Sequence, residues 1–390
     1  MINYKLASNS WDQKEIDALQ RVIDSGNFSM GKEVQNFEEV FADFIGSKYA
    51  VMVNSGSSAN LLMLSALNLY PKFKRKSDIK LNVVVPAVSW STSYYPIHQC
   101  GFELRFIDVD LRTFNLDVDQ LEASIDENTV AVLAVNLLGC PAELEKINQI
   151  CLGKNIFLLE DNCESFGAKL NDKYCGTFGE MGTFSFFFSH HLQTMEGGMI
   201  VTDDFELHNY LKSLRAHGWI RGIQSNLDIF KSTGNAFEDS FRFVLPGYNL
   251  RPLEFSGAVG VEQLNKWPSM LENRRNNAKT AKEFLNTEIC YLQEEIGFSS
   301  WFGFGLVLNK DFQGKRDEVL QALSKENVES RPIVAGNFLK NPVIEFMDCK
   351  KVICRNADYI DRNGFFIGND SVDLRKKIEM VGKILCQKMF

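Results

Sequence analysis

A short loop rich in serine and glycine follows the apolar run Tyr49–Val53 and leads directly into a helical pattern. Its residues are Ser55, Gly56, Ser57 and Ser58. The first N–H groups of a helix lack intrahelical partners and the helix dipole adds partial positive charge there, so this loop could bind a phosphate group. Serine and glycine are also common at helix starts that bind nothing. The loop alone leaves both interpretations open.

Two acidic residues, Glu160 and Asp161, end the apolar run Ile156–Leu159. In open α/β sheets, ligands bind at the carboxyl ends of the strands. A solvated strand end would carry the same residue types. The apolar residues before the pair favour a buried edge instead, where a carboxylate needs a cationic partner. A protonated pyridine nitrogen would be such a partner.

Two adjacent histidines, His190 and His191, lie in a loop after a predicted strand, and the turn Glu196-Gly197-Gly198 follows them. Imidazole titrates near neutral pH, so it can act as a base and as an acid in one reaction. A histidine in an arbitrary loop is usually a surface residue. His190 therefore gains its meaning from the motif around it, whereas we expect a structural role for His191.

Together these segments resemble the DegT/DnrJ/EryC1/StrS family of sugar-nucleotide aminotransferases, which use pyridoxal phosphate. Members typically show an S-G-[ST] loop, an E-D strand end and a segment like S-F-x-x-x-K-x-x-x-x-G-E-G-G. FSMGKEVQNFEEVFADFIG and VLPGYNLRPLEFSGAVGVEQL also look like family segments, so the resemblance covers nearly the whole chain. It implies an α/β fold of fold type I, similar to aspartate aminotransferase, with a mostly parallel central sheet and a smaller C-terminal α+β domain.

The chain departs from the aminotransferase pattern at one position. Counted back from Glu196, His190 stands where the aminotransferases carry the lysine that binds the cofactor covalently. Imidazole cannot form a stable imine with the cofactor aldehyde, so we expect a non-covalently bound cofactor. Lys169 and Lys173 lie too far back in the motif to replace that lysine.

A histidine at this position is similar to the sugar 3-dehydratase branch of the family, as are PAVSWSTSYYP, EDNCESFGA, RAHGW and FVLPGYNLRPLE. This resemblance implies a carbon–oxygen lyase that removes the C3 hydroxyl of a GDP-linked 4-keto-6-deoxy sugar, of mannose type or a related heptose. L-glutamate would convert pyridoxal phosphate to pyridoxamine phosphate, and ammonia would be released. The implied pathway is deoxysugar biosynthesis, such as that of colitose, for lipopolysaccharide O-antigen or capsule.

A cousin branch that acts on CDP-linked sugars shares the histidine but holds an iron–sulfur cluster through closely spaced cysteines after it. This chain has no cysteine between Cys175 and Cys290. Paired ligands at short spacing, which a structural zinc site would need, are also absent from the sequence. We therefore expect neither an iron–sulfur cluster nor a metal site.

The resemblance also implies a set of residues that bind the cofactor. These are Gly56, Ser57, Trp90, Asp161, Glu164, Ser185 and Asn249. Gly56, Ser57 and Ser185 would hold the phosphate, and Asn249 would reach it from the other subunit of a homodimer with shared active sites. Trp90 would stack on the pyridine ring rather than pack in the core, and Asp161 would pair with the ring nitrogen. Glu164 would lie near the ring hydroxyl.

His190 is the implied catalytic residue, removing a proton and then donating it to the departing C3 hydroxyl. His217, Arg221 and Arg331 are candidates for binding the nucleotide sugar. A sugar-nucleotide 4-aminotransferase is one alternative, but its chemistry uses the missing lysine. A non-catalytic relative that binds cofactor or sugar nucleotide is another, and the retained Asp161 argues against it.

The order of apolar patterns predicts how these residues are positioned. Short apolar runs alternate with helical stretches, which is typical of a mostly parallel sheet covered by helices. The runs are Tyr49–Val53, Val83–Val85, Leu104–Val109, Val130–Val135, Ile156–Leu159 and Thr183–Phe187. A helix that starts with a capping box at Ser10 and Gln13 precedes them and ends at Gly26.

After Pro252 the rhythm of strands and helices weakens, and a helical stretch over Glu254–Leu285 leads into shorter pieces. We therefore predict a large cofactor-binding α/β domain over residues 1–252 and a small C-terminal domain over residues 253–390. A chain of 390 residues is long enough for two lobes at ~150 residues per domain.

Composition excludes several classes of protein. Apolar residues make up 45% and charged residues 24% of the chain, as in ordinary folded proteins. The net charge of −8 provides no broad basic field for nucleic acid or anionic lipid, and no apolar run approaches the ~20 residues that span a bilayer. Nine cysteines without a CxxC pair predict reduced thiols, mostly in the core, and a cytoplasmic location.

Overall fold

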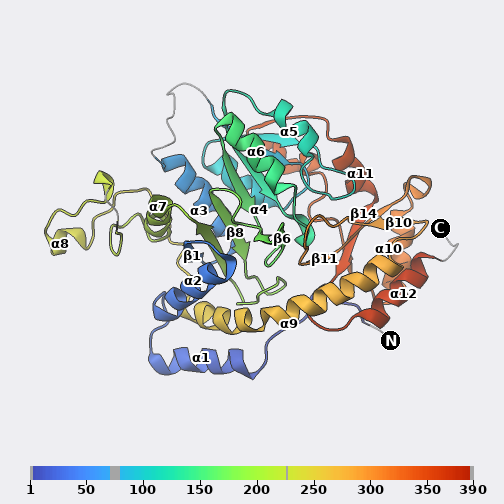
Figure 1. The fold of residues 1–390 in the computed structure, drawn as a ribbon, viewed down its shortest axis with the longest axis horizontal. Coiled ribbons are helices and arrows are strands. Elements are labelled where there is room, and N and C mark those ends of the chain that lie inside the picture. The colour runs from blue at the N-terminus through green and yellow to red at the C-terminus, as the bar shows by residue number, and fades with distance from the viewer. Residues whose placement is uncertain (1–2, 71–79, 225–226, 387–390) are drawn as a thin grey trace.

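The chain is built around one large sheet, which a computed structural model describes together with the rest of residues 3–70, 80–224 and 227–386. Its eight strands have the spatial order β1-β9-β8-β5-β4-β2-β3-β13, and they lie at the centre of Figure 1. All neighbouring pairs of described strands in this sheet are parallel except the two that include β9. The predicted α/β class with a mostly parallel sheet is therefore confirmed.

Six of the eight strands of this sheet, all except β9 and β13, agree with the predicted apolar runs to within a few residues. Their bounds are β1 Tyr49–Val53, β2 Asn82–Pro86, β3 Glu103–Ile107, β4 Thr129–Val135, β5 Phe157–Asp161, β8 Met181–Ser185, β9 Gly198–Thr202 and β13 Cys349–Lys350. Strand β8 ends two residues before the predicted end at Phe187, because that side chain is half-exposed where the chain leaves the sheet.

Helices cover both faces of the sheet. One face carries α3 (Gly56–Leu69), α4 (Ser91–Gln99) and α7 (Phe205–Arg215), and the other carries α5 (Val118–Ser124), α6 (Leu144–Lys154) and α2 (Lys32–Ile45). Alternate residues of β2 enter the two cores, Val83 and Val85 on one side and Val84 on the other. Strands buried on both faces read as continuous apolar runs, which is why they were visible in the sequence.

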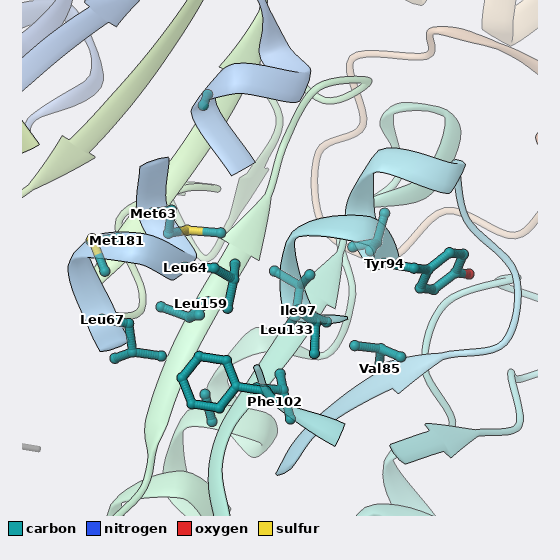
Figure 2. Close-up of a cluster of buried hydrophobic side chains, with 14 of the residues drawn as sticks. Met63, Leu64, Leu67, Val85, Tyr94, Ile97, Phe102, Leu133, Leu159 and Met181 are labelled. Carbon is teal, nitrogen blue, oxygen red and sulfur yellow. The ribbon is translucent and has the colours of Figure 1, made fainter. Parts of the chain in front are cut away.

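Figure 2 shows the larger of these cores, where α3 and α4 meet the strands. The labelled side chains are Met63, Leu64 and Leu67 of α3, Tyr94 and Ile97 of α4, Phe102 beside β3, and Val85, Leu133, Leu159 and Met181 of the strands. Each of these residues is 0% exposed, and full burial of such a side chain contributes ~1.5–3 kcal/mol to the stability of the fold. This core fixes the start of α3 and the start of α4 against the ends of the strands.

The first helix, α1 (Gln13–Ser25), ends at Gly26 as predicted but begins differently. The predicted capping box of Ser10 and Gln13 is wrong. Asp12 is the N-cap and accepts from the Lys14 N–H, while the Glu15 carboxylate accepts from the Asp12 N–H at 2.8 Å. Ser10 instead bonds to distant parts of the chain, so it is not available as a cap.

A second, antiparallel sheet lies in the C-terminal part, with the order β10-β11-β14-β12. Its strands are β10 Cys290–Leu292, β11 Gly303–Leu308, β12 Ser330–Arg331 and β14 Gly364–Gly368, and its helices are α10 Arg316–Lys325, α11 Arg355–Asn363 and α12 Arg375–Leu385. Helix α9 (Glu254–Phe284) runs from the large sheet to this small one (Figure 1).

The division into domains 1–252 and 253–390 stays a prediction. Helix α9 begins two residues after the predicted boundary, and several contacts cross this boundary. The Tyr4 hydroxyl donates to the Gly368 carbonyl at 2.8 Å in the small sheet, and β13 extends the large sheet by pairing with β3.

Between α7 and α9 the chain projects away from the sheet, with the short helix α8 (Ala236–Asp239) on the projecting part (Figure 1). Phe237, Phe241 and Phe243 on this arm are 87%, 72% and 53% exposed. A small hairpin, β6 (Lys169–Leu170) and β7 (Lys173–Tyr174), completes the described strands. All nine cysteines are unpaired and five are buried, and no described helix is long and apolar enough to cross a membrane.

Candidate active site

A cavity of about 400 Å³ lies where several strands of the large sheet end. Val135, Asp161 and Ser185, the last residues of β4, β5 and β8, line it, as does the start of α3. Seven of the predicted site residues line this one cavity: Gly56, Ser57, Trp90, Asp161, Glu164, Ser185 and His190. The expectation that ligands bind at the carboxyl ends of the strands predicts this location.

The start of α3 forms one wall of the cavity and is suited to an anion. Ser55 is the N-cap, and its hydroxyl accepts from the Ser58 N–H at 3.1 Å. The first N–H groups of the helix have no partner within the helix, so those of Gly56 and Ser57 remain for a ligand. A Cβ on Gly56 would lie 2.5 Å from the Cβ of Ser185, so no other residue fits at this position without a shift of β8.

Asp161 is held in the cavity by three donors. Its Oδ2 accepts from the Asn60 side-chain amide at 2.8 Å and from the Ser93 hydroxyl at 2.7 Å, and its Oδ1 accepts from the Cys163 N–H at 3.1 Å. The residue is 4% exposed. Three hydrogen bonds fix the position of this buried carboxylate, so the cavity offers an oriented acceptor to a cationic ligand.

Glu160, the neighbour of Asp161, does not take part in the cavity. Successive residues of a strand point to opposite faces, and Glu160 accepts from the N–H groups of Gly176, Phe178 and Gly179 on the other side. The need for a cationic partner, predicted for the acidic pair, is therefore wrong for Glu160, because backbone N–H groups satisfy it.

Trp90 stands at the start of α4 and presents its indole to the cavity. It is 57% exposed, although tryptophan is usually well buried in folded proteins. The interpretation of Trp90 as a core residue is therefore wrong. An exposed aromatic face beside a fixed carboxylate suits a flat, positively charged ring.

Glu164 is the second carboxyl group that lines the cavity. Burial raises its pKa to about 7, the N–H of Leu138, donated to Oε2 at 2.9 Å, opposes this shift, and the negative charge of Asp161 adds to it. Asp161 is thus surrounded by hydrogen-bond donors, whereas Glu164 has a raised pKa that allows its protonated form near neutral pH. This division provides both an acceptor and a donor.

His190 lies at the side of the cavity, on the loop between β8 and β9. Its N–H donates to the Phe187 carbonyl at 2.8 Å, and its ring meets that of Phe302 edge to face with centroids 5.2 Å apart. Burial, with the positive charge of Arg274, lowers the pKa of His190 to about 4. The imidazole is therefore neutral at physiological pH and can accept a proton. None of the described residues that line the cavity is a lysine.

His191 points away from the cavity. It is 1% exposed, and its ring meets Trp267 of α9 edge to face with centroids 5.2 Å apart. Burial lowers the pKa of His191 well below its usual value. This placement agrees with the structural role expected for it.

Four predicted residues do not line the cavity of their own chain. Asn249 is exposed, and its Oδ1 accepts from the Arg251 guanidinium at 2.9 Å. His217 packs against Trp219 on the projecting arm, near the exposed Arg221. Arg331 lies on β12 in the small sheet. Their proposed roles toward phosphate and substrate stay predictions.

The sequence analysis missed several residues of the cavity, including Asn60, Ser93 and Phe302. Asn60 follows Gly56 by four residues on α3, so helical spacing would have placed both on one face of the helix. Phe302 is more than a hundred residues from His190 in the sequence, and no local pattern indicates that the two meet. No group of three or more His, Cys, Asp and Glu side chains suited to a metal ion occurs among the described residues.

Comparison with known proteins supports this picture. The sequence profile of the DegT/DnrJ/EryC1/StrS aminotransferase family matches residues 9–365. GDP-4-keto-6-deoxy-D-mannose 3-dehydratase of Yersinia pseudotuberculosis is 51% identical over 391 residues, which cover 99% of this chain and 98% of the relative.

Two solved structures of GDP-4-keto-6-deoxymannose-3-dehydratase, each 47% identical, superpose with a TM-score of 0.93 over 98% of this chain and 100% of theirs. One is a histidine-to-asparagine variant with bound GDP-perosamine. The other contains a trapped PLP-glutamate geminal diamine. The fold-type I architecture implied by the sequence is confirmed by these neighbours.

Proposed function

Because the chain belongs to the DegT/DnrJ/EryC1/StrS aminotransferase family, we propose that it is a pyridoxal-phosphate-dependent 3-dehydratase of a GDP-linked 4-keto-6-deoxy sugar. L-glutamate supplies the amino group, and ammonia and a 4-keto-3,6-dideoxy sugar are the products. The observation that carries this proposal is the presence of His190 in the lining of a cavity whose described residues include no lysine.

The cavity fits pyridoxal phosphate or pyridoxamine phosphate by three features of the chain. The start of α3, where Gly56 places no side chain, suits the phosphate. Ser57 and Ser185 line the same part of the cavity. Asp161 suits the pyridinium nitrogen, and the open face of Trp90 suits the ring. When bound, the cofactor supplies an amino group for the sugar ketone and a ring that withdraws electrons.

His190 is the acid–base group in this proposal. Its neutral imidazole removes one proton, and the imidazolium that results donates this proton to the C3 hydroxyl as the C3–O bond breaks, so that water leaves. Since Nδ1 lies 3.5 Å from the Ser189 hydroxyl, Nε2 is the atom we assign to proton transfer. One group suffices for both steps, and it returns to its starting state.

The carboxyl groups of Asp161 and Glu164 have different roles toward the cofactor ring. Asp161, held in place by its three donors, would pair with the protonated ring nitrogen. Glu164, with its pKa raised to about 7, donates a hydrogen bond toward the ring hydroxyl when it is protonated. Phe187 and Phe302 line the same cavity and exclude water from the His190 side.

The proposal includes a homodimer with shared sites and a cytoplasmic location. Asn249 is exposed and turned toward Arg251 rather than into its own cavity, so it is available to the cofactor phosphate of a partner subunit. The exposed phenylalanines of the arm, Phe237, Phe241 and Phe243, offer apolar surface for that contact. Nine unpaired thiols suit a reducing compartment.

A panel of 4-keto nucleotide sugars tests the proposal. Purified protein is incubated with pyridoxal phosphate, L-glutamate and each sugar, ammonia is assayed, and products are identified by mass. We expect loss of oxygen at C3 with release of ammonia, fastest with the GDP-linked 6-deoxyhexose or a related heptose. A 4-amino sugar without ammonia would identify an aminotransferase instead, and no turnover of any sugar would favour a non-catalytic relative.

A further inference from the structure

The loop that carries His190 is held from behind by one face of α9. The Ser256 hydroxyl donates to the Thr194 carbonyl at 3.3 Å, and Gln263 Oε1 accepts from the Gln193 N–H at 3.1 Å. Ser256 and Gln263 are seven residues apart, so they lie on the same side of the helix. Both are buried, and the loop therefore rests on an ordered surface away from the cavity.

Gln193 joins this loop to the N-terminal strap, which we define as Ser8–Asp12. Its side-chain amide donates to the Ser8 carbonyl at 2.8 Å, and its Oε1 accepts from the N–H and the hydroxyl of Ser10 at 2.9 and 3.0 Å. The Trp11 indole donates to the Gln193 carbonyl at 2.7 Å. With its N–H on Gln263, every polar group of Gln193 is bonded, and the residue is 3% exposed.

The strap is itself anchored to α9 by a buried ion pair. Glu15 is fully buried, and its two oxygens accept from the Gln263 amide at 2.7 Å and from Lys266 Nζ at 2.6 Å. Lys266 also lies 2.8 Å from the Asp12 carboxylate at the end of the strap. Breaking one partner of such a pair is costly, so the strap has a fixed attachment.

The imidazole of His190 has little to hold it directly. Within the part of the chain that the structure describes, the imidazole has one hydrogen-bond partner, the Ser189 hydroxyl at 3.5 Å, and it packs against the rings of Phe187 and Phe302. Its position therefore depends on the backbone of its loop. That backbone is fixed three residues later, at Gln193.

We infer that Gln193 is a positioning residue, through which the N-terminal strap and α9 hold His190 in the position from which it transfers a proton. This inference rests on the proposed role of His190. It adds a function for a segment, Ser8–Asp12, that does not line the cavity. Gln193 does not line the cavity either, so it acts only through the loop.

Gln193→Met tests the inference, because methionine keeps the length of the side chain and removes its hydrogen bonds. The control is Gln149→Met, the same change at an exposed position of α6. Hydrogen exchange is measured by mass spectrometry on peptides that cover residues 187–196. We expect about tenfold faster exchange there in Gln193→Met, the size set by loss of one or two net hydrogen bonds. Exchange in β4 and β5 should stay unchanged.

The kinetic readout is the turnover number per bound cofactor. A displaced catalytic group loses rate without losing binding, so kcat should fall ~10- to 100-fold while the KM of the GDP-sugar stays within about twofold. Trp11→Phe removes one donor to Gln193 and keeps the ring, so it should change both readouts in the same direction by less. If Gln193→Met fails to fold, the exchange and kcat of Trp11→Phe test the inference in its place.

Wild-type exchange over 187–196 in these variants would overturn the inference. Faster exchange with an unchanged kcat per bound cofactor would also overturn it, since loop mobility would then have no effect on the rate of the reaction. Full activity of His190→Asn would reject the proposed role of His190 instead. The exchange result distinguishes these failures because it does not depend on turnover.

Discussion

The backbone of Gly56 lies so close to the side chain of Ser185 that a Cβ on Gly56 would be 2.5 Å from the serine Cβ and 2.9 Å from its Oγ. Cys163 Sγ would lie at 3.0 Å on a third side. The start of α3 and the end of β8 thus form one continuous wall of the cavity. The φ of Gly56 is not in the left-handed region, so backbone conformation does not require a glycine here. The close approach to Ser185 does.

Gly56→Ala should weaken cofactor binding. The added methyl group must displace β8 or the start of α3, and overpacking of this kind costs ~1–3 kcal/mol. We expect the Kd of pyridoxal phosphate, measured by fluorescence titration, to rise at least about tenfold, which corresponds to ~1.4 kcal/mol. Gly153→Ala is the control, since a Cβ there meets no atom within 4 Å. Equal Kd values for the two variants would contradict this account of the phosphate site.

The positive charge of Arg274 should contribute to the position of the acid limb of the pH profile. Arg274 is 4% exposed, and its guanidinium donates to the carbonyls of Trp301, Phe302 and Asn369. Burial is the larger cause that lowers the pKa of His190 to about 4, and the positive charge of Arg274 adds to this shift. The base form of His190 is therefore lost only as the pH falls toward that value.

Arg274→Met removes this charge, so the pKa of His190 should rise toward 6.5 and the acid limb of kcat/KM should move to higher pH. A unit charge near a partly screened imidazole shifts its pKa by roughly half to one unit. Arg274→Lys keeps the charge and should keep the limb in place. Glu164 and Glu196 also line the cavity, and they act equally in the wild-type protein and both variants. A limb that does not move in Arg274→Met would mean that His190 is not the titrating base.

Local patterns predicted the scaffold well because its signals are local. The strands buried on both faces appear as apolar runs, and the start of α3 appears as a serine and glycine loop. Asp161 and His190 were found because Asp161 ends a strand and His190 lies in the loop after one, each within a family motif. Phe302, Arg274 and Gln263 reach the His190 loop from α9 and the small sheet, so only the tertiary fold reveals them. Ser10 was misassigned as a cap because its true partner, Gln193, is 183 residues away.

Mixing two inactive variants should restore activity if the sites are shared between subunits. His190→Asn lacks the proposed acid–base group, and Asn249→Ala lacks the proposed contact from the partner. A mixed dimer has one site with both groups intact, so reassociation of equal amounts should recover about a quarter of wild-type activity. Asn249→Ala must be severely impaired by itself for the test to apply. Inactive mixtures, alongside full recovery of wild-type chains treated identically, would place Asn249 in its own subunit.

The cofactor should not be attached covalently. Protein loaded with pyridoxal phosphate is treated with borohydride, denatured and weighed by mass spectrometry. Because none of the described residues lining the cavity is a lysine, we expect the mass of the unmodified chain. A reduced adduct on any lysine would contradict the structure of the site presented here. A family aminotransferase with its lysine is the positive control.

The central claim is that His190 moves the proton that permits loss of the C3 hydroxyl, and His190→Asn tests it most directly. Asparagine keeps hydrogen-bonding capacity without basicity. The measurement is the rate of ammonia release per bound cofactor with the GDP-linked 4-keto-6-deoxy sugar and L-glutamate. We predict unchanged binding of pyridoxal phosphate and a rate reduced ~10²- to 10⁴-fold, the usual effect of removing a positioned acid–base group. Ammonia release near the wild-type rate would contradict the claim and require another base.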